Sequence, residues 1–339
     1  MAITEAIAAV CAGEHLTRAA AAHAMQVLMA GEASPAQAAA FLIALHVRGE
    51  SVDEIAGFAE TMRHFATKVP TKRSPLVDTC GTGGDHSGTF NISTAAAFVV
   101  AGAGIAVAKH GNRSATSRCG SADVLEALGV SIDCGPGHVG RCIDEAGVGF
   151  LFARSLHNAM RHVAPVRAEV GVRTVFNVLG PLTNPAGADR QVMGVYSGSL
   201  VRPIAEVLLR LGARHVFVVH GDDGLDEMSL TGPTRVAEAR GGAVKEYRLT
   251  PAEFGLDTAS SEVFRGGDAA MNAEILRDVL EGKPGPRRDI VLLNAAPAIV
   301  AGEKAEDLRG GIECARQAID SGAALDKLEQ LVKLSHDSR

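Results

Sequence analysis

The sequence predicts an α/β protein, with a small all-α N-terminal domain, a large α/β domain with a mostly parallel central sheet, and a C-terminal helical region. Apolar residues recur at helical spacing through residues 1–69, and short apolar runs alternate with helical stretches from residue 76 onward. The pattern becomes helical again from Asp268 to the end. At about 150 residues per domain, a chain of 339 residues suggests two domains or one large α/β unit. We expect them at 1–69 and 76–339, joined by a linker at 70–75.

The N-terminal domain shows start and stop signals for several helices. Gly31 and Gly49 stand where helices would end, and Ser34 and Ser51 stand where the next helices would be capped. The Ala-rich faces suit close helix packing, and a remaining apolar face would contact either a partner subunit or the next domain. The expected helices are 18–29, 35–47 and 52–65.

The large domain is predicted from the alternation of strands and helices. Such alternation is typical of parallel strands joined by crossover helices, and ligands of such sheets bind at the carboxyl ends of the strands. Between residues 228 and 254 the pattern weakens into turns and antiparallel strands. Candidate strands are 76–79, 105–109, 130–134, 148–152, 192–196 and 216–220, and helices are expected near 93–103, 121–128, 138–146 and 200–211.

Composition and charge argue against several classes of protein. A chain with 47% hydrophobic and 21% charged residues is expected to fold rather than to be disordered. The net charge of -6 argues against a broad nucleic-acid surface. The six cysteines include no C-x-x-C pair, so neither a zinc site nor a disulfide framework is expected. Without a signal sequence or a long apolar stretch, we expect a cytoplasmic protein that has no membrane partner.

Two runs of the sequence lack acidic residues but keep cations. Residues 86–122 contain no Asp or Glu, and neither do residues 146–168. At the overall acidic frequency, about four acids would be expected in the first run. Burial of Gly- and Ala-rich segments would explain the missing acids but not the cations that remain, so anion binding is the sharper interpretation. These cations are Lys109, Arg113, Arg118, Arg154, Arg161 and Arg167.

A glycine-rich turn follows the first predicted strand. Residues 78–85 read DTCGTGGD, and the polar residues of 89–94 lead into an Ala/Val helix. Such a turn exposes backbone N–H groups and a helix N-terminus to an anion, although an ordinary tight turn is the alternative. A Walker loop is excluded because Gly-Lys-Ser/Thr is absent, and the dinucleotide pattern needs glycine where this chain has His86.

The next predicted strand ends in a second loop of similar construction. Residues 109–123 read KHGNRSATSRCGSAD, and Ser121 is expected to cap the helix that follows. Lys109 alone would be read as a solvated lysine. Its place at a strand end, inside an acid-free run, favours phosphate binding instead.

A cluster of acidic residues follows the predicted strand 216–220. Residues 220–227 read HGDDGLDE, and four carboxylates so close together repel one another unless cations intervene. Oxygen ligands without cysteine suit Mg²⁺ carried by a phosphorylated substrate, with a solvated acidic turn as the alternative. Together with the two loops, the cluster describes a site for Mg²⁺ and a diphosphate.

These segments, together with HVAPVRAEVGVRTVFNVLGPLTNPA at 162–186, resemble the anthranilate phosphoribosyltransferase family of tryptophan biosynthesis. The resemblance implies a nucleoside phosphorylase-type α/β domain and a homodimer formed through the N-terminal helices. It implies that the phosphoribosyl group of phosphoribosyl diphosphate (PRPP) moves to the amine of anthranilate, with Mg²⁺ as cofactor and pyrophosphate as leaving group. The sequence does not reveal whether an anthranilate synthase glutamine-amidotransferase partner exists.

The resemblance also implies roles for individual residues. PRPP would contact Gly81, Gly84, Asp85, Thr89, Asn91, Ile92, Ser93, Thr94, Lys109, Asn112, Ser117 and Ser121. Magnesium would be held at Ser93, Asp226 and Glu227, and anthranilate at Gly81, Asn112 and Arg167. Lys109 and Asn112 would serve catalysis, whereas His110 is expected to orient the loop rather than to transfer a proton. The chain departs from the family pattern at Ala115-Thr116, Arg118-Cys119 and Leu156-His157-Asn158.

Two alternatives remain at this stage. A pyrimidine nucleoside phosphorylase-like enzyme would require a Lys-His-Ser-Thr loop where residues 109–112 read KHGN. A non-catalytic, nucleic-acid-binding relative would be expected to show a basic face and to lack Arg167 or the acidic pair at 226–227. Neither pattern is met by this acidic chain.

Overall fold

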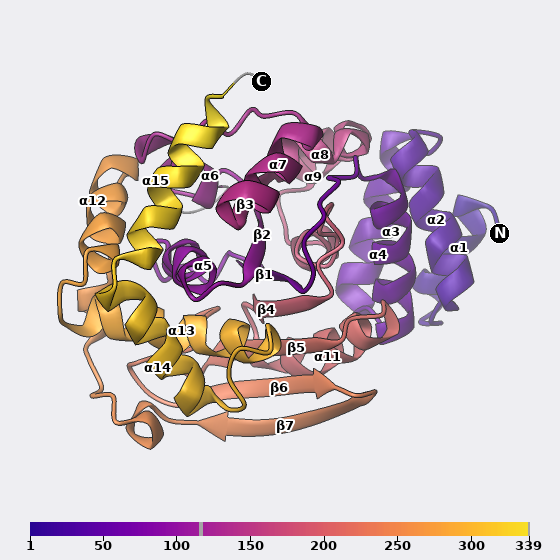
Figure 1. The fold of residues 1–339 in the computed structure, drawn as a ribbon. Helices are drawn as coiled ribbons and strands as arrows, with labels where there is room; N and C mark the ends of the chain where they lie inside the picture. The colour runs from indigo at the N-terminus through magenta and orange to yellow at the C-terminus, as the bar shows by residue number, and fades with distance from the viewer. Residues whose placement is uncertain (115–117, 338–339) are drawn as a thin grey trace.

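The structure is a computed structural model that describes residues 1–114 and 118–337 (Figure 1). Its centre is a sheet of seven strands in the order β3-β2-β1-β4-β5-β6-β7. Neighbours from β3 to β5 run parallel, whereas β5, β6 and β7 pair antiparallel. The strands are β1 Leu76–Gly81, β2 Ala106–Gly111, β3 Val148–Phe152, β4 Arg190–Gly194, β5 His215–Gly221, β6 Thr234–Arg240 and β7 Ala243–Leu249. The expected fold class is confirmed.

Four helices at the N-terminus lie on one side of the molecule, seen on the right in Figure 1. They are α1 Ile3–Cys11, α2 Arg18–Ala30, α3 Pro35–Arg48 and α4 Val52–Phe65. Ser34 and Ser51 cap α3 and α4 as expected, because each hydroxyl accepts a hydrogen bond from the N–H three residues on. Gly31 ends α2 in the left-handed conformation. No capping residue in the sequence marks the start of α1, because its N-cap Ala2 has no side chain that can accept a hydrogen bond.

Helices cover both faces of the sheet. Those that connect and precede the central strands are α5 Ile92–Gly102, α6 Ser121–Ala127, α7 Pro136–Ala146, α8 Ala153–Leu156, α9 Ala164–Val170, α10 Phe176–Leu179 and α11 Val201–Arg210. The C-terminal helices are α12 Ala269–Leu280, α13 Pro286–Ala301, α14 Leu308–Asp320 and α15 Ala323–Ser335. Within the described chain, no helix is long and apolar enough to cross a lipid bilayer.

Alternate residues of the central strands serve two different cores. Phe217 and Val219 of β5 pack with α5 and the C-terminal helices, whereas Val216 and Val218 pack with α11 and the N-terminal helices. Burial on both faces explains why this strand reads as a continuous apolar run. The sheet is therefore held rigidly from both sides, and the loops at the carboxyl ends of its strands project from a fixed frame.

The expected strand at 130–134 is wrong. Val130 and Ile132 are buried, but Ser131 N–H donates to Ser335 Oγ at 2.9 Å instead of pairing with a strand. The thiol of Cys134 likewise contacts the Ser335 carbonyl of α15. A short apolar run signals burial but not the element that buries it, and here the C-terminal helix takes the place of a neighbouring strand.

Candidate active site

The three loops singled out in the sequence meet at one edge of the sheet. Strands β1 and β2 are parallel neighbours, and β5 is separated from β1 only by β4. The Gly83 N–H donates to Asp226 Oδ2 at 2.8 Å, and the Ser93 N–H donates to Glu227 Oε1 at 3.2 Å. The glycine-rich turn, the start of α5 and the acidic loop therefore form one site.

Close packing of glycines places Asp226 in this site. A Cβ atom at Gly81 would lie 2.5 Å from Asp226 Oδ2, and one at Gly194 would lie 1.5 Å from the Asp226 carbonyl oxygen. Real Cβ atoms do not approach backbone oxygens so closely, so only glycine fits at 194 without moving Asp226. The acidic loop is thus seated directly on the ends of β1 and β4.

The acidic cluster divides into structural and site-facing residues. Asp222 forms ion pairs with Arg235 and Arg248, and Asp223 accepts hydrogen bonds from Ser229 and Thr231. The mutual repulsion expected from the sequence is relieved for these two carboxylates by protein partners. Only the pair at 226–227 remains for a cation.

The electrostatics of that pair suit a divalent cation. Burial, with the nearby Asp85 carboxylate, raises the pKa of Asp226 to about 7. Burial and the neighbouring Asp226 raise the pKa of Glu227 well above its ordinary value. Asp85 Oδ2 is buried without a hydrogen-bond partner in the described chain. Such crowded oxygens fit Mg²⁺, which would relieve the repulsion.

The protein supplies few ligands to such a cation. Among the described residues, no group of three or more His, Cys, Asp or Glu side chains is arranged to hold a metal ion. The carboxylates of Asp226 and Glu227 would therefore need oxygens from a bound phosphate or from water to complete a coordination shell. This fits a cation that arrives with a phosphorylated substrate.

Lys109, near the carboxyl end of β2, is 3% exposed. Its Nζ donates to the Thr79 carbonyl at 2.6 Å and lies 3.5 Å from Ser93 Oγ. Burial lowers the pKa of Lys109, whereas the carboxylates of Asp78 and Glu227 act in the opposite direction. A buried ammonium without a directly bonded carboxylate can stabilise an added anion strongly.

The glycine-rich turn keeps backbone donors available. Gly83 and Gly84 have positive φ values of 63° and 75°, which glycine adopts without strain. In the described parts of the chain, the N–H groups of Gly84 and Asp85 have no acceptor. Together they provide donors of the kind that binds phosphate oxygens.

The residues at the start of α5 differ in accessibility. Ile92 and Thr94 are both 1% exposed, so a ligand could reach little more than their backbone. Asn91 uses its side chain to tie loops together: Nδ2 donates to the Cys119 carbonyl and Oδ1 accepts from Asn272. The hydroxyl of Thr89 lies beside that of Ser87. The binding roles of these residues stay predictions.

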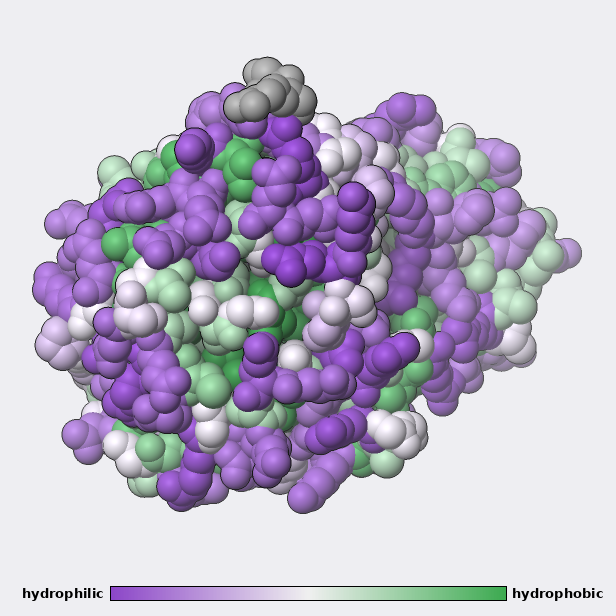
Figure 2. Space-filling view, in the orientation of Figure 1, coloured by the Kyte–Doolittle hydropathy of each residue, from purple (hydrophilic) through white to green (hydrophobic). Residues whose placement is uncertain are grey.

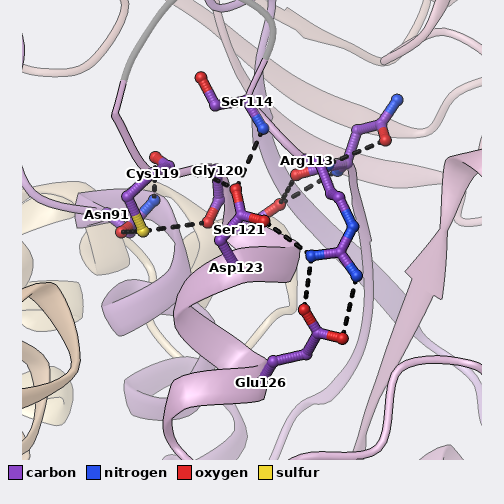
Figure 3. A network of polar contacts seen from close by, with 9 residues as sticks. Asn91, Arg113, Ser114, Cys119, Gly120, Ser121, Asp123 and Glu126 are labelled. Carbon is purple, nitrogen blue, oxygen red and sulfur yellow. Dashed lines mark hydrogen bonds and ion pairs between the residues drawn. The ribbon is translucent and has the colours of Figure 1, made fainter. Parts of the chain in front are cut away.

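Figure 3 shows the loop that follows β2. The expected cap at Ser121 is wrong by one position, because α6 begins at Ser121 and Gly120 is its N-cap. The Ser121 hydroxyl instead accepts from Asn112 N–H at 3.1 Å and donates to the Asn112 carbonyl, while Asp123 accepts from Gly120 N–H. Ser121 thereby fixes Asn112. The predicted PRPP residue Ser117 lies outside the described residues.

Arg113 is not the free cation that the acid-free run suggested. Its guanidinium forms ion pairs with Asp123 and Glu126 of α6, both beyond the end of that run (Figure 3). Counting charges along the sequence missed this pairing, because the acidic partners follow the loop in the next helix. Lys109 is therefore the better placed cation for a phosphate.

His110 belongs to a buried polar network. Its Nε2 lies 3.2 Å from His157 Nε2, and its N–H donates to Asp78 Oδ1, while Asn184 donates to Asp78 Oδ2. Burial lowers the pKa of His110 to about 3 and that of His157 to about 4. Both rings are neutral near pH 7. This favours a loop-orienting role over proton transfer.

The buried histidines predict a pH effect on stability. Both have a native pKa below the unfolded value of about 6.5, so they lose stabilisation as the pH falls below about 6.5. Asp78, whose pKa is raised to about 6, acts in the opposite direction. The test therefore compares two proteins. Between pH 6.5 and pH 4.5, the free energy of unfolding measured in urea should fall by roughly 1–2 kcal/mol less for His110→Gln than for the parent.

The control for this measurement is His23→Gln, at an exposed position of α2. Its unfolding free energy should follow the parent across the same pH range. If His110→Gln follows the parent as well, the interpretation of His110 as a buried neutral imidazole is wrong.

Arg167 lies on α9 with its guanidinium over the Phe176 ring, 5.2 Å from the ring centroid. No carboxylate of the described chain lies within ion-pair distance of it, so its charge is available to an anionic ligand. The connection from α9 to α10 returns to the glycine-rich turn, since Arg173 Nη2 donates to the Gly84 carbonyl. The segment that carries Arg167 thus reaches the glycine-rich turn.

Comparison with known proteins decides the family. Residues 4–66 match the glycosyl transferase family, helical bundle domain, and residues 73–325 match the glycosyl transferase family, a/b domain. An anthranilate phosphoribosyltransferase of Symbiobacterium thermophilum is 57% identical over 97% of both chains. One of Rubrobacter xylanophilus is also 57% identical, over 98% of this chain and 97% of its own. The chain belongs to the anthranilate phosphoribosyltransferase family.

Solved structures of anthranilate phosphoribosyltransferases have the same fold. The enzyme of Thermus thermophilus superposes with a TM-score of 0.93 at 51% identity, covering 97% of this chain and 99% of its own. The Saccharomyces cerevisiae enzyme, solved in complex with PRPP and Mg, has a TM-score of 0.89 at 29% identity, covering 98% and 97%. These relatives support neither the phosphorylase-like nor the nucleic-acid-binding alternative.

Arg173 contacts the candidate site but was not among the residues expected there from the sequence. It lies in the quoted segment 162–186, which resembles the anthranilate phosphoribosyltransferase family, but outside the acid-free run that ends before Glu169. Its contact with Gly84 joins positions that are 89 residues apart. The only signal in the sequence was a second arginine shortly after Arg167.

Proposed function

We propose that this chain transfers the phosphoribosyl group of PRPP to the amine nitrogen of anthranilate and releases pyrophosphate, as a step of tryptophan biosynthesis. The observation that carries the proposal is the contact of the Gly83 N–H with Asp226, which brings a phosphate-binding turn and a carboxylate pair into one site. The available charge of Arg167, on a segment that reaches the same turn, supports an anionic second substrate.

The diphosphate of PRPP would lie against the glycine-rich turn and the end of β2. The N–H groups of Gly84 and Asp85 and the ammonium of Lys109 would bind its oxygens. Ser93, Asp226 and Glu227 would hold Mg²⁺, which neutralises charge on the diphosphate when it is bound. Gly81 and Asn112 would lie between the two substrates, and Arg167 would hold the anthranilate carboxylate through its guanidinium.

Catalysis would rest on charge stabilisation and positioning. An arylamine is neutral at pH 7, so its lone pair can attack C1 of the ribose without a strong base. The neutral His110, bonded to His157, fixes the end of β2 instead. Lys109 and the turn amides stabilise the charge that develops on the departing pyrophosphate. Contacts of the bound anthranilate with Arg167 and Asn112 place its amine nitrogen close to C1 of the ribose.

The fluorescence of anthranilate tests the proposed function directly. With purified protein, PRPP and Mg²⁺, the anthranilate signal should fall as the amine is converted. Omission of PRPP, or chelation of Mg²⁺, should abolish the change. A signal that stays constant with all components present would contradict the proposal.

The carboxylate pair predicts a specific metal dependence. The double variant Asp226→Asn with Glu227→Gln should need at least about tenfold more Mg²⁺ for half-maximal activity, because each amide removes an anionic ligand. The measurement is a Mg²⁺ titration at saturating PRPP. The matched control is Asp222→Asn, which lies in the same loop but pairs with Arg235 and Arg248. Equal titration curves for all three proteins would remove the pair from the metal site.

Arg167 predicts an effect confined to one substrate. Arg167→Ala should lose a charge-assisted contact of about 1.5 to 3 kcal/mol, which makes the use of anthranilate roughly ten- to hundredfold weaker. The PRPP KM should change little. Arg309→Ala is the control, because Arg309 is exposed on α14, outside every segment assigned to the site. Equal damage to both substrates in steady-state kinetics would contradict the assignment.

We also infer the domain limits 1–69 and 76–339, with a linker at 70–75. The last N-terminal helix ends at Phe65 and β1 begins at Leu76, which supports these limits. The gap between the two family matches falls at nearly the same place, since one match ends at residue 66 and the other begins at residue 73. A cytoplasmic location is proposed on the free cysteines, which are typical of a reducing compartment.

We propose a homodimer formed through the N-terminal helices. Figure 2 shows hydrophobic groups on the helical side of a largely hydrophilic face. A groove between α1 and α3 is lined mainly by apolar residues, and Val47 at its rim is 79% exposed. Burial of this groove against a second copy would remove apolar surface from water. Sedimentation equilibrium, which reads the molecular mass, would show a single-chain mass if the proposal is wrong.

A further inference from the structure

Arg173 is held in an unusual set of contacts beside the glycine-rich turn. It lies between α9 and α10, where its Nη2 donates to the Gly84 carbonyl and lies 3.4 Å from His86 Nε2. Its guanidinium stacks over the Tyr196 ring, 4.3 Å from the ring centroid. Within the described chain, no carboxylate is close enough to pair with it. These contacts leave the role of Arg173 to be explained, because it donates to a backbone carbonyl and not to a carboxylate of the described chain.

The contact with Gly84 fixes the direction of a backbone donor. A trans peptide is planar, so the C=O of Gly84 and the N–H of Asp85 point in opposite directions. Because the Gly84 carbonyl points at the Arg173 guanidinium, the Asp85 N–H points away from that guanidinium. That N–H has no acceptor in the described residues. Gly84 has a φ of 75°, so its backbone has few steric restraints of its own and depends on such a contact for its orientation.

The turn is attached to the sheet at other points. Thr82 N–H donates to the Gly194 carbonyl at 3.0 Å, and Thr82 Oγ1 accepts from Tyr196 N–H at 3.0 Å. The Gly83 N–H donates to Asp226 Oδ2. These bonds hold the first half of the turn to β4 and to the acidic loop. The contact of Arg173 holds the second half, and it comes from the segment that carries Arg167.

We propose that Arg173 is a positioning residue for the diphosphate: stacked on Tyr196, it holds the Gly84 carbonyl so that the Asp85 N–H is aimed at the bound phosphate. The same contact joins the segment proposed to bind the aromatic acid to the turn proposed to bind the diphosphate. This inference rests on the proposed function, because it concerns the same site. Arg173 itself touches the turn and need not touch either substrate.

Binding of pyrophosphate with Mg²⁺ tests the proposal, since this ligand occupies the diphosphate position and cannot react with anthranilate. By calorimetry, Arg173→Ala should bind it roughly tenfold more weakly than the parent, which is the loss expected for one misdirected hydrogen bond to an anion. The KM for PRPP should rise by a similar factor. Anthranilate binding measured without pyrophosphate should change less than about twofold.

Two further variants keep the test informative if Arg173→Ala does not fold. Arg173→Lys retains a charged donor but not the planar fork, and should recover part of the lost affinity. Tyr196→Leu removes the ring beneath the guanidinium and should weaken pyrophosphate binding more than Tyr196→Phe, which keeps the aromatic face. Arg309→Ala is the control, at an exposed position on α14, and should bind both ligands as the parent does.

The outcomes separate the two proposals. If the parent binds pyrophosphate with Mg²⁺ and Arg173→Ala binds it equally well, the positioning role is wrong while the proposed function stands. If Arg173→Ala loses both ligands to the same degree, Arg173 supports the whole segment rather than the turn, and the inference is also overturned. Failure of the parent itself to bind the ligand would overturn both the proposed function and this inference.

Discussion

Replacing Lys109 with methionine is expected to lower kcat/KM for PRPP by about 10²- to 10³-fold, the range measured when one preorganised donor to developing negative charge is removed. The Lys109 ammonium is buried and donates to the Thr79 carbonyl with Ser93 Oγ nearby, so it is fixed in place before substrate arrives. Methionine keeps a similar length and apolar stem but provides no charge. The measurement is steady-state kinetics with saturating anthranilate.

Folding must be checked in the same variant. Lys109 offsets the buried carboxylates of Asp78 and Glu227, so its loss also changes the free energy of unfolding. Urea unfolding and calorimetric binding of anthranilate would show whether the variant is intact. Lys72→Met, at an exposed position in the linker, is the matched control. A folded Lys109→Met variant that retains more than about a third of the parent kcat/KM would remove this lysine from the mechanism.

Gly194→Ala is expected to have the second large effect, even though residue 194 bears no functional group. The added Cβ would lie 1.5 Å from the Asp226 carbonyl oxygen, so the acidic loop must move away from the ends of β1 and β4. We expect a loss of stability of about 1–3 kcal/mol from overpacking. Displacement of the carboxylate pair should lower Mg²⁺-dependent activity by about a hundredfold or more.

The control is Gly137→Ala, because a Cβ at this exposed position of α7 meets no atom within 4 Å. Alanine should there stabilise the helix by about 0.5–1 kcal/mol and leave activity unchanged. The two substitutions are chemically identical and differ only in what the new methyl group meets. Equal Mg²⁺ titration curves for Gly194→Ala and the parent would show that the seating of Asp226 on Gly194 does not matter.

Local chemistry explains how much of the fold was predictable. Ser34 and Ser51 mark helix starts by bonding the backbone three residues on, a signal that depends on neighbours in the sequence alone. The start of α1 carries no comparable signal, because Ala2 cannot cap it through a side chain. The strand expected at 130–134 was wrong because its apolar residues indicate burial alone. The residue that it contacts, Ser335, lies 204 residues away and leaves no local signal.

The candidate site shows the same division. The glycine-rich turn and the carboxylates at 226–227 were predicted to share one site, and the contact of Gly83 with Asp226 bears out their proximity. The pairing of Arg113 with Glu126 was not predicted, because a count of charges does not say which ones meet. Arg173 was missed for a similar reason, since its importance lies in a contact with Gly84 rather than in a motif.

A crystal structure of the protein with PRPP and Mg²⁺ would test most directly whether the three loops bind one diphosphate. The account predicts that the diphosphate lies between the turn at 81–85 and the end of β2, with Mg²⁺ bridging it to Asp226 and Glu227. The Asp85 N–H and Lys109 Nζ should both lie within hydrogen-bond distance of its oxygens. A diphosphate bound away from the turn, or a metal that contacts neither carboxylate, would contradict the account.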